Sequence, residues 1–204
     1  MARMLARIIL AFTLSTAAPL PAQTAPNPAP AEDLVKVALD TEAGRIVLAL
    51  DRGRAPLSTA NFLKYVDSKR YDGEPFYRSV TAEGSGFIQG GIRSDSLKLF
   101  PPVAHEPTNQ TGLKHVAGTV SLARLEPGTA QADFFILTTD IPGFGAGGQG
   151  GDADGFAAFG RVIEGMDVVT RINASPVSPT KGEGVMKGQL LDPPVKIVKA
   201  SRLP

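Results

Sequence analysis

The chain has 204 residues, and its 21 lysines and arginines against 20 aspartates and glutamates leave a formal net charge of +1 at pH 7. A charge this small provides no strong field to attract nucleic acid or an anionic membrane surface, so we expect no nucleic-acid partner. The chain has no cysteine and only two histidines, His105 and His115, which excludes disulfides and thiolate nucleophiles and disfavours a metal centre. The length favours one folded domain.

The N-terminal residues follow the order of a secretory signal peptide. Two arginines precede an apolar run over residues 8–14, and small residues follow it. This run is shorter than the about 20 apolar residues that span a bilayer. We therefore predict a signal peptide over residues 1–22, a Pro- and Ala-rich linker over residues 23–33 and a folded domain over residues 34–204. The alternative is an envelope protein that keeps its N-terminal segment as a membrane anchor.

The folded part is predicted to begin with a hairpin and a helix. Two apolar runs, residues 35–39 and 46–50, flank a polar segment with Gly44, and alternation within the first run is typical of a strand with one buried face. A proline at residue 56 then precedes apolar side chains at helical spacing, which predict a helix that ends before Gly73.

The rest of the chain is predicted to be mostly strands. A loop with both histidines is expected over residues 103–118 and a second helix over residues 164–173. No strand–helix–strand rhythm is present, so the pattern favours a closed antiparallel barrel over a parallel α/β sheet. The further strand-like segments are residues 86–91, 118–124, 133–139, 155–163 and 194–202.

Five motifs occur in an order typical of one enzyme family. They are FYRSV, GFIQGG, GLKHVAGTVSLAR, DFFILTT and FAAFGRVIEGMDVV. With these motifs the chain resembles the cyclophilin-type peptidyl-prolyl isomerases, especially their bacterial exported branch, from residue 35 to the C-terminus. The resemblance implies a mainly-β fold, namely a closed eight-stranded antiparallel barrel capped by two helices, with a substrate groove on its outer surface.

The resemblance also implies an activity. A periplasmic enzyme is expected, which accelerates cis/trans rotation at X-Pro bonds while exported proteins fold. It would act on proline-containing polypeptides without a cofactor or a metal, as a monomer. In this family the arginine of the F-[HY]-R motif is the catalytic group, and here that residue is Arg78. An arginine cannot act as a base, but it can donate a hydrogen bond to the prolyl nitrogen and draw its lone pair out of amide resonance. This lowers a rotational barrier of ~18–20 kcal/mol.

The matching motifs further imply a set of substrate contacts. Phe135 is expected to form the floor of an apolar slot for the proline ring, with Phe87 and Phe144 as its walls, and Gln89 to hold a backbone carbonyl of the substrate. The segment along which the peptide lies, and the remaining expected contacts, are Ala123, Arg124, Phe76, Asp133 and Phe156.

Three positions depart from the family pattern. Asp133 stands where the family often has a glutamine, and its carboxylate could either pair with Arg78 and weaken it or simply orient it. Phe156 stands where many eukaryotic members have a histidine, and the family's tryptophan in the preceding loop is absent. A second hypothesis therefore stays open, in which the same barrel is a binding module that holds peptides as a chaperone or complex subunit, with slow or no catalysis. The glycine and aspartate pattern over residues 147–154 is a single copy and does not support a calcium site.

Overall fold

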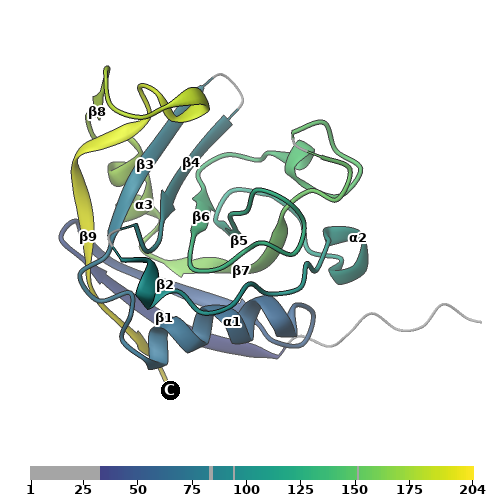
Figure 1. Ribbon diagram of the computed structural model, residues 1–204. Coiled ribbons are helices and arrows are strands. Elements are labelled where there is room, and N and C mark those ends of the chain that lie inside the picture. The colour runs from purple at the N-terminus through teal and green to yellow at the C-terminus, as the bar shows by residue number, and fades with distance from the viewer. Residues whose placement is uncertain (1–32, 83–84, 94, 151) are drawn as a thin grey trace, which may run out of the picture.

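Eight strands pair in a closed ring. The computed structural model describes residues 33–82, 85–93, 95–150 and 152–204. Its sheet follows the order β1-β2-β7-β5-β6-β4-β3-β9, and β9 returns to β1 to close the ring. This confirms the predicted closed eight-stranded antiparallel barrel (Figure 1). The barrel strands are β1 (Leu34–Thr41), β2 (Gly44–Asp51), β3 (Pro75–Ala82), β4 (Ser85–Gly90), β5 (Thr119–Leu122), β6 (Phe134–Leu137), β7 (Ala157–Glu164) and β9 (Leu190–Arg202).

The predicted hairpin is the β1–β2 pair, and both strands are longer than the apolar runs that indicated them. The turn is tight because Thr41 pairs with Gly44, and the Thr41 hydroxyl donates to the Gly44 carbonyl at 2.6 Å. Gly44 has a φ of +130°, a conformation that residues with a Cβ rarely adopt. A two-residue strand, β8 (Val177–Ser178), pairs with β9 beyond the ring.

Two helices lie where the spacing predicted them. Helix α1 (Pro56–Asp67) begins at the proline and ends earlier than expected, at the cap residue Ser68. Its first turn is capped by a residue that is remote in sequence. The Glu106 carboxylate accepts hydrogen bonds from the backbone N–H groups of Leu57 and Ser58 at 3.0 and 2.7 Å. Helix α3 (Met166–Asn173) follows Gly165, which has a left-handed conformation.

The structure adds short helical turns that the sequence did not indicate. A four-residue helix, α2 (Thr108–Thr111), lies within the predicted loop 103–118 and ends at Gly112. Three single turns of 3-10 helix are also present: η1 (Ser96–Lys98), η2 (Pro142–Phe144) and η3 (Gly184–Met186). Both η2 and η3 contribute residues to the surface groove described below.

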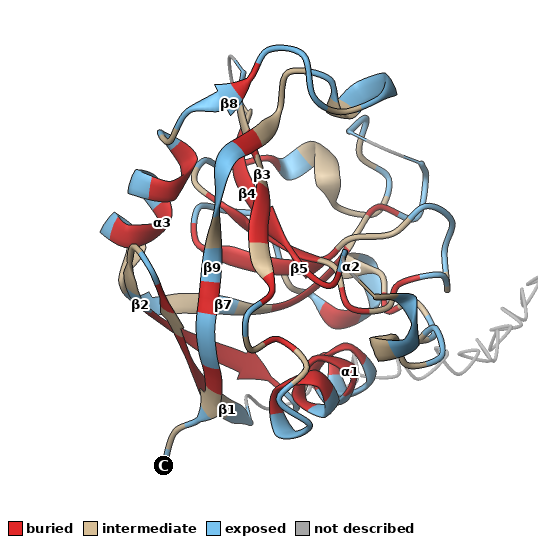
Figure 2. Cartoon of the chain, turned by 60° about the vertical axis from the view of Figure 1, so that its left-hand side comes forward, coloured by how far each residue is buried: buried red, intermediate tan, exposed pale blue. Residues whose placement is uncertain are grey.

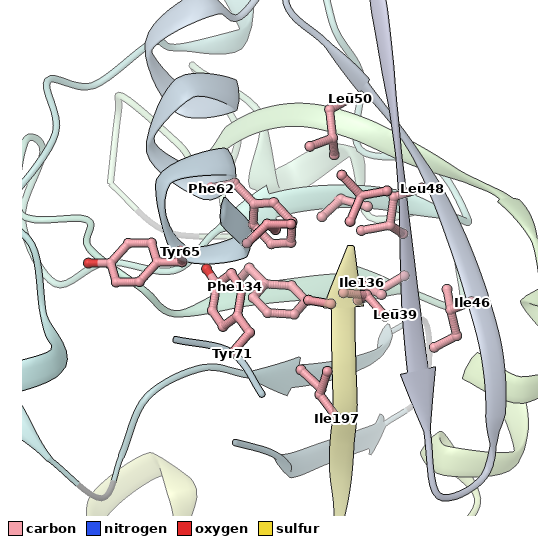
Figure 3. Close-up of a cluster of buried hydrophobic side chains, with 14 of the residues drawn as sticks. Leu39, Ile46, Leu48, Leu50, Phe62, Tyr65, Tyr71, Phe134, Ile136 and Ile197 are labelled. Atoms are coloured by element: carbon pink, nitrogen blue, oxygen red, sulfur yellow. The ribbon is translucent and has the colours of Figure 1, made fainter. Parts of the chain in front are cut away.

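The barrel core is aromatic where α1 packs against it. Phe62 of α1 meets Phe134 of β6 edge-on, with ring centroids 5.1 Å apart, and Tyr71 lies 5.0 Å from Phe62 (Figure 3). Along β9, Leu191 and Ile197 are buried in the core, whereas most of their neighbours are exposed or half-buried. Figure 2 shows buried and exposed stretches alternating along this strand. Full burial of a side chain of this size contributes about 1.5–3 kcal/mol, so this cluster is a main source of the stability of the fold.

The predicted signal peptide, residues 1–22, and all but the last residue of the predicted linker, residues 23–33, lie outside the described residues. In the part of the chain that the structure describes, no helix has both the length and the apolar character needed to cross a membrane.

Candidate active site

A β-bulge at Tyr77 places two neighbouring side chains on the outer face of the barrel. Phe76 pairs with Gly90 and Arg78 with Gln89, so Tyr77 is an extra residue on β3. A bulge interrupts the alternation of side chains along a strand. As a result Tyr77 and Arg78 both reach the side chain of Gln89, although a regular strand would point them to opposite faces.

Phe76 does not belong to the site, and the prediction that it contacts substrate is wrong. Its side chain is 0% exposed and lies in the barrel core. There it packs edge-on against Phe134, with ring centroids 5.6 Å apart. Phe76 and Arg78 are two residues apart, a spacing that puts both side chains on one face of a regular strand, but the bulge at Tyr77 sends them to opposite sides of the barrel wall.

Two glutamine side chains hold the guanidinium of Arg78. Its Nε donates to Oε1 of Gln189 at 2.8 Å, and its Nη1 donates to Oε1 of Gln89 at 2.9 Å. The Cζ atom lies 5.2 Å from the ring centroid of Phe87. Burial lowers the pKa of Arg78, but a guanidinium remains protonated at neutral pH. The site therefore has a fixed cation beside an apolar surface.

Four phenylalanines form that apolar surface. Phe87 of β4 and Phe135 of β6 lie on neighbouring strands, with ring centroids 5.6 Å apart. Phe144 of η2 meets Phe135 edge-on at 5.7 Å, and Phe156, just before β7, does so at 5.3 Å. Because these rings come from four different segments, the slot between them forms only when β4, β6 and the segment from η2 to β7 are packed together.

The rings and Arg78 line one groove of about 780 Å³ on the outer surface. All of the predicted site residues except Phe76 line it: Arg78, Phe87, Gln89, Ala123, Arg124, Asp133, Phe135, Phe144 and Phe156. The period-2 pattern explains part of this result. Gln89 is the register partner of Phe135, so the two side chains share the outer face while Ile88 and Phe134 face the core.

Asp133 orients the site without pairing with Arg78. Its Oδ2 accepts a hydrogen bond from the Tyr77 hydroxyl at 2.6 Å, and that hydroxyl oxygen accepts one from Nε2 of Gln89, also at 2.6 Å. Among the described residues no ion pair joins Asp133 to Arg78. Burial raises the pKa of the Asp133 carboxyl, and the bond from Tyr77 partly offsets this effect. Of the two roles left open by the sequence, the contacts favour the orienting one.

Arg124 lines the groove, but its guanidinium is paired with the carboxylate of Asp152. The side chain is 3% exposed, and its two terminal nitrogens donate to both carboxylate oxygens of Asp152 at 2.7 Å. One of them also donates to the carbonyl of Gly155. Arg124 thus ties the segment before β7 to the groove wall. Its neighbour Ala123 packs against the phenylalanine cluster.

Sequence reasoning missed the wall contributed by the segment between β8 and β9. Val185 and Met186 of η3 line the groove, and Gln189 binds Arg78. Gln189 and Arg78 are 111 positions apart in the chain, so no local sequence pattern indicates their contact. Ile92, Arg93 and Leu99, which follow β4, also line the groove.

The two histidines lie outside the groove. His115 is 2% exposed, its Nε2 lies 3.1 Å from the Ser121 hydroxyl, and its ring stacks against Phe135. Burial lowers the pKa of His115 to about 4, so the ring is neutral at pH 7. His105 approaches the carbonyl of Asp154 at 3.2 Å. Within the described ranges, no group of three or more potential metal ligands occurs.

The fold matches solved cyclophilin structures. A crystal structure of a cyclophilin-type peptidyl-prolyl cis-trans isomerase from Cryptosporidium parvum superposes with a TM-score of 0.66 at 20% identity. The match covers 84% of this chain and 99% of that one. At this identity the likeness concerns the fold alone.

Sequence relatives provide the finer comparison. Peptidyl-prolyl cis-trans isomerase A of Dickeya dadantii is 37% identical over 177 residues, which cover 84% of each chain. Peptidyl-prolyl cis-trans isomerase B of Escherichia coli is 33% identical over 140 residues, covering 67% of this chain and 82% of that protein. The family model for cyclophilin type peptidyl-prolyl cis-trans isomerases matches residues 34–202. The chain therefore belongs to the cyclophilin-type peptidyl-prolyl cis-trans isomerases.

Proposed function

We propose that the protein accelerates X-Pro rotation in polypeptides that fold after export, with Arg78 as the catalytic group. The observation that carries the proposal is the guanidinium of Arg78, held by two glutamines beside a slot of four phenylalanines. A cation next to apolar rings suits a substrate that presents an apolar ring and, one bond away, a nitrogen that gains basicity as its amide twists.

The proposed mechanism needs no proton transfer. The proline ring lies in the slot between Phe87, Phe135 and Phe144, and a free N–H of Arg78 donates to the prolyl nitrogen as the C–N bond rotates. The hydrogen bond from Arg78 strengthens only when the nitrogen lone pair leaves amide resonance, so it stabilises the transition state more than either ground state. Gln89 donates from Nε2 to the hydroxyl of Tyr77 and also bonds to the Asp133 carboxylate, so in this proposal it exchanges one of these bonds for a bond to a substrate carbonyl.

The first experiment measures cis/trans exchange. NMR exchange spectroscopy of short X-Pro peptides is recorded with the protein from Thr24 onward, beside Arg78→Ala and Arg78→Lys. We expect the native protein to catalyse exchange and both variants to lose at least about tenfold in kcat, because Lys lacks the planar fork that the two glutamines hold. Variants that retain full activity would contradict the role of Arg78.

The peptide-holding alternative predicts a different result. A binding module would bind X-Pro peptides through the slot without raising the exchange rate, and Arg78→Ala would leave peptide affinity nearly unchanged. Its separate signature is suppression of aggregation of an unfolded client by a protein with no detectable isomerase activity.

Export is tested by cell fractionation. The signal-peptide order of residues 1–22 supports it. The full chain, expressed in a Gram-negative host, is expected in the periplasmic fraction, shortened near residue 22. Replacing the apolar run 8–14 with serines should leave the full-length chain in the cytoplasm. Full-length protein retained in the membrane fraction would instead favour the anchored alternative.

A further inference from the structure

We infer that Gln189 is a positioning residue for Arg78, and that the segment before β9 therefore sets the catalytic geometry. The inference rests on the proposed role of Arg78. Its starting point is the 2.8 Å hydrogen bond from Nε of Arg78 to Oε1 of Gln189. Gln189 belongs to none of the motifs that indicated the site.

The two glutamines hold different parts of the guanidinium. Gln189 accepts from Nε, and Gln89, on the neighbouring strand β4, accepts from Nη1. Because the group is planar, two acceptors at different nitrogens fix the orientation of the whole plane. A guanidinium has five N–H donors. Within the described part of the chain no acceptor is recorded at Nη2, so its two donors remain for a substrate.

The backbone of Gln189 is itself fixed beside Arg78. Its carbonyl accepts from the backbone N–H of Ser79 at 2.9 Å, and its own N–H donates to the carbonyl of Met186 at 3.0 Å. The next residue, Leu190, is the register partner of Arg78. Gln189 therefore lies beside the bulge of β3, and two backbone hydrogen bonds hold its main chain there.

The neutral charge of Gln189 matters as much as its position. A carboxylate at this distance would form an ion pair and withdraw the positive charge from a substrate nitrogen. An amide oxygen orients the cation and leaves its charge intact. Gln89 is also neutral, and the carboxylate of Asp133, which lines the same groove, bonds to Tyr77 instead. Both contacts to Arg78 thus orient it without neutralising it.

The test removes the acceptor while keeping the length of the side chain. Gln189→Met is compared with the native protein and with Gln110→Met, a matched change at an exposed glutamine of α2. We expect Gln189→Met to lower kcat about tenfold, the typical effect of losing one hydrogen bond to a charged group. Peptide Kd, measured by NMR titration, should stay within about twofold because the phenylalanine slot is unchanged. Gln110→Met should behave as the native protein.

A second readout does not depend on activity. The Nε–H signal of Arg78, assigned by its loss in Arg78→Lys, should exchange slowly with water in the native protein and at least about tenfold faster in Gln189→Met. If the native protein catalyses no exchange, the proposed function fails while this signal still tests the contact. The inference is overturned if Gln189→Met leaves both kcat and the Nε–H exchange rate unchanged. It is also overturned if kcat, peptide affinity and thermal stability all fall together, which would indicate a structural role.

Discussion

At the scale of single residues, His115 shows how a neighbouring ring sets the charge of a group. It is stacked against Phe135 with an interplanar angle of 18°, and its Nδ1 is buried without a hydrogen-bond partner among the described residues. A charged imidazole would lose its hydration there without compensation. Burial therefore lowers the pKa of His115 from 6.5 to about 4, and a neutral ring supports the floor of the slot.

This pKa shift predicts a pH dependence of stability. In the unfolded chain His115 takes up a proton near its ordinary pKa of 6.5, whereas the folded state resists protonation until about pH 4. Because the unfolded state binds more protons in this interval, stability is full above pH 6.5 and falls as the pH decreases toward 4. One pKa unit corresponds to about 1.4 kcal/mol, so the total loss is about 3 kcal/mol.

The measurement is the free energy of unfolding by urea at pH 7.5 and at pH 4.5. His115→Gln should show a smaller difference between the two pH values than the native protein, because glutamine does not titrate. His105→Gln, at the half-buried histidine near Asp154, provides the matched control. An equal pH difference in the native protein and in His115→Gln would contradict the prediction.

At the scale of elements, an ion pair helps to hold the segment from η2 to β7 to the barrel. Arg124, 3% exposed, binds both oxygens of Asp152, and Phe144 and Phe156 lie at the two ends of this segment. The bond from Arg124 lowers the pKa of Asp152 to about 2. A cation this deeply buried depends on its partner, unlike the arginine of an ordinary surface salt bridge.

Asp152→Asn should therefore lower both the Tm and the affinity for X-Pro peptides at pH 7. The pair stabilises the fold above the ordinary pKa of 3.8, and this contribution is lost as the pH falls toward about 2. The difference in Tm between native protein and variant should shrink over that interval. Asp154→Asn, two residues away and exposed, is the control. A Tm difference that stays constant down to pH 2 would refute the role of the pair.

At the scale of the whole molecule, the barrel wall separates two aromatic clusters. Phe76, Phe62 and Phe134 pack inside, whereas Phe87, Phe135, Phe144 and Phe156 pack on the outer face. The inner cluster stabilises the fold, and the outer one is proposed to bind substrate. Substitutions on the two sides of the wall should therefore affect different measurements.

Phe76→Leu and Phe156→Ala make this comparison. Phe76→Leu should cost about 1–3 kcal/mol of unfolding free energy, because the smaller side chain leaves a cavity in the core, while peptide Kd stays within about twofold. Phe156→Ala should weaken peptide affinity severalfold with a smaller loss of stability, since that ring is only half-buried. Unfolding in urea and NMR titration measure the two effects. Weaker peptide binding by Phe76→Leu would contradict the assignment of Phe76 to the core alone and would indicate that it contributes to the substrate site.

The two faces of the barrel wall also show which parts of the fold and the site could be predicted from the sequence. Strand positions followed from the apolar patterns, and the outer residues Gln89 and Phe135 followed from the resemblance of their motifs to the family. The burial of Phe76 could not be predicted because the bulge at Tyr77 has no marker in the sequence, and without a bulge the two-residue spacing of Phe76 and Arg78 would place both side chains on one face. Gln189 was missed because its contact is set by the pairing of β3 with β9, and residues 111 positions apart share no local pattern.

The place of β9 in the ring has a consequence for the order in which the barrel can form during synthesis. Strands β1 to β7 make an open sheet with unpaired edges at β1 and β3, and β9 pairs with both of those edges. Because β9 follows all the other barrel strands in the chain, neither edge is covered until β9 has been synthesised. Contacts between residues as far apart in sequence as Val37 and Arg202 slow folding and prolong the exposure of unpaired, aggregation-prone strand edges. A protein proposed to help other chains through slow folding steps thus has a long vulnerable interval of its own.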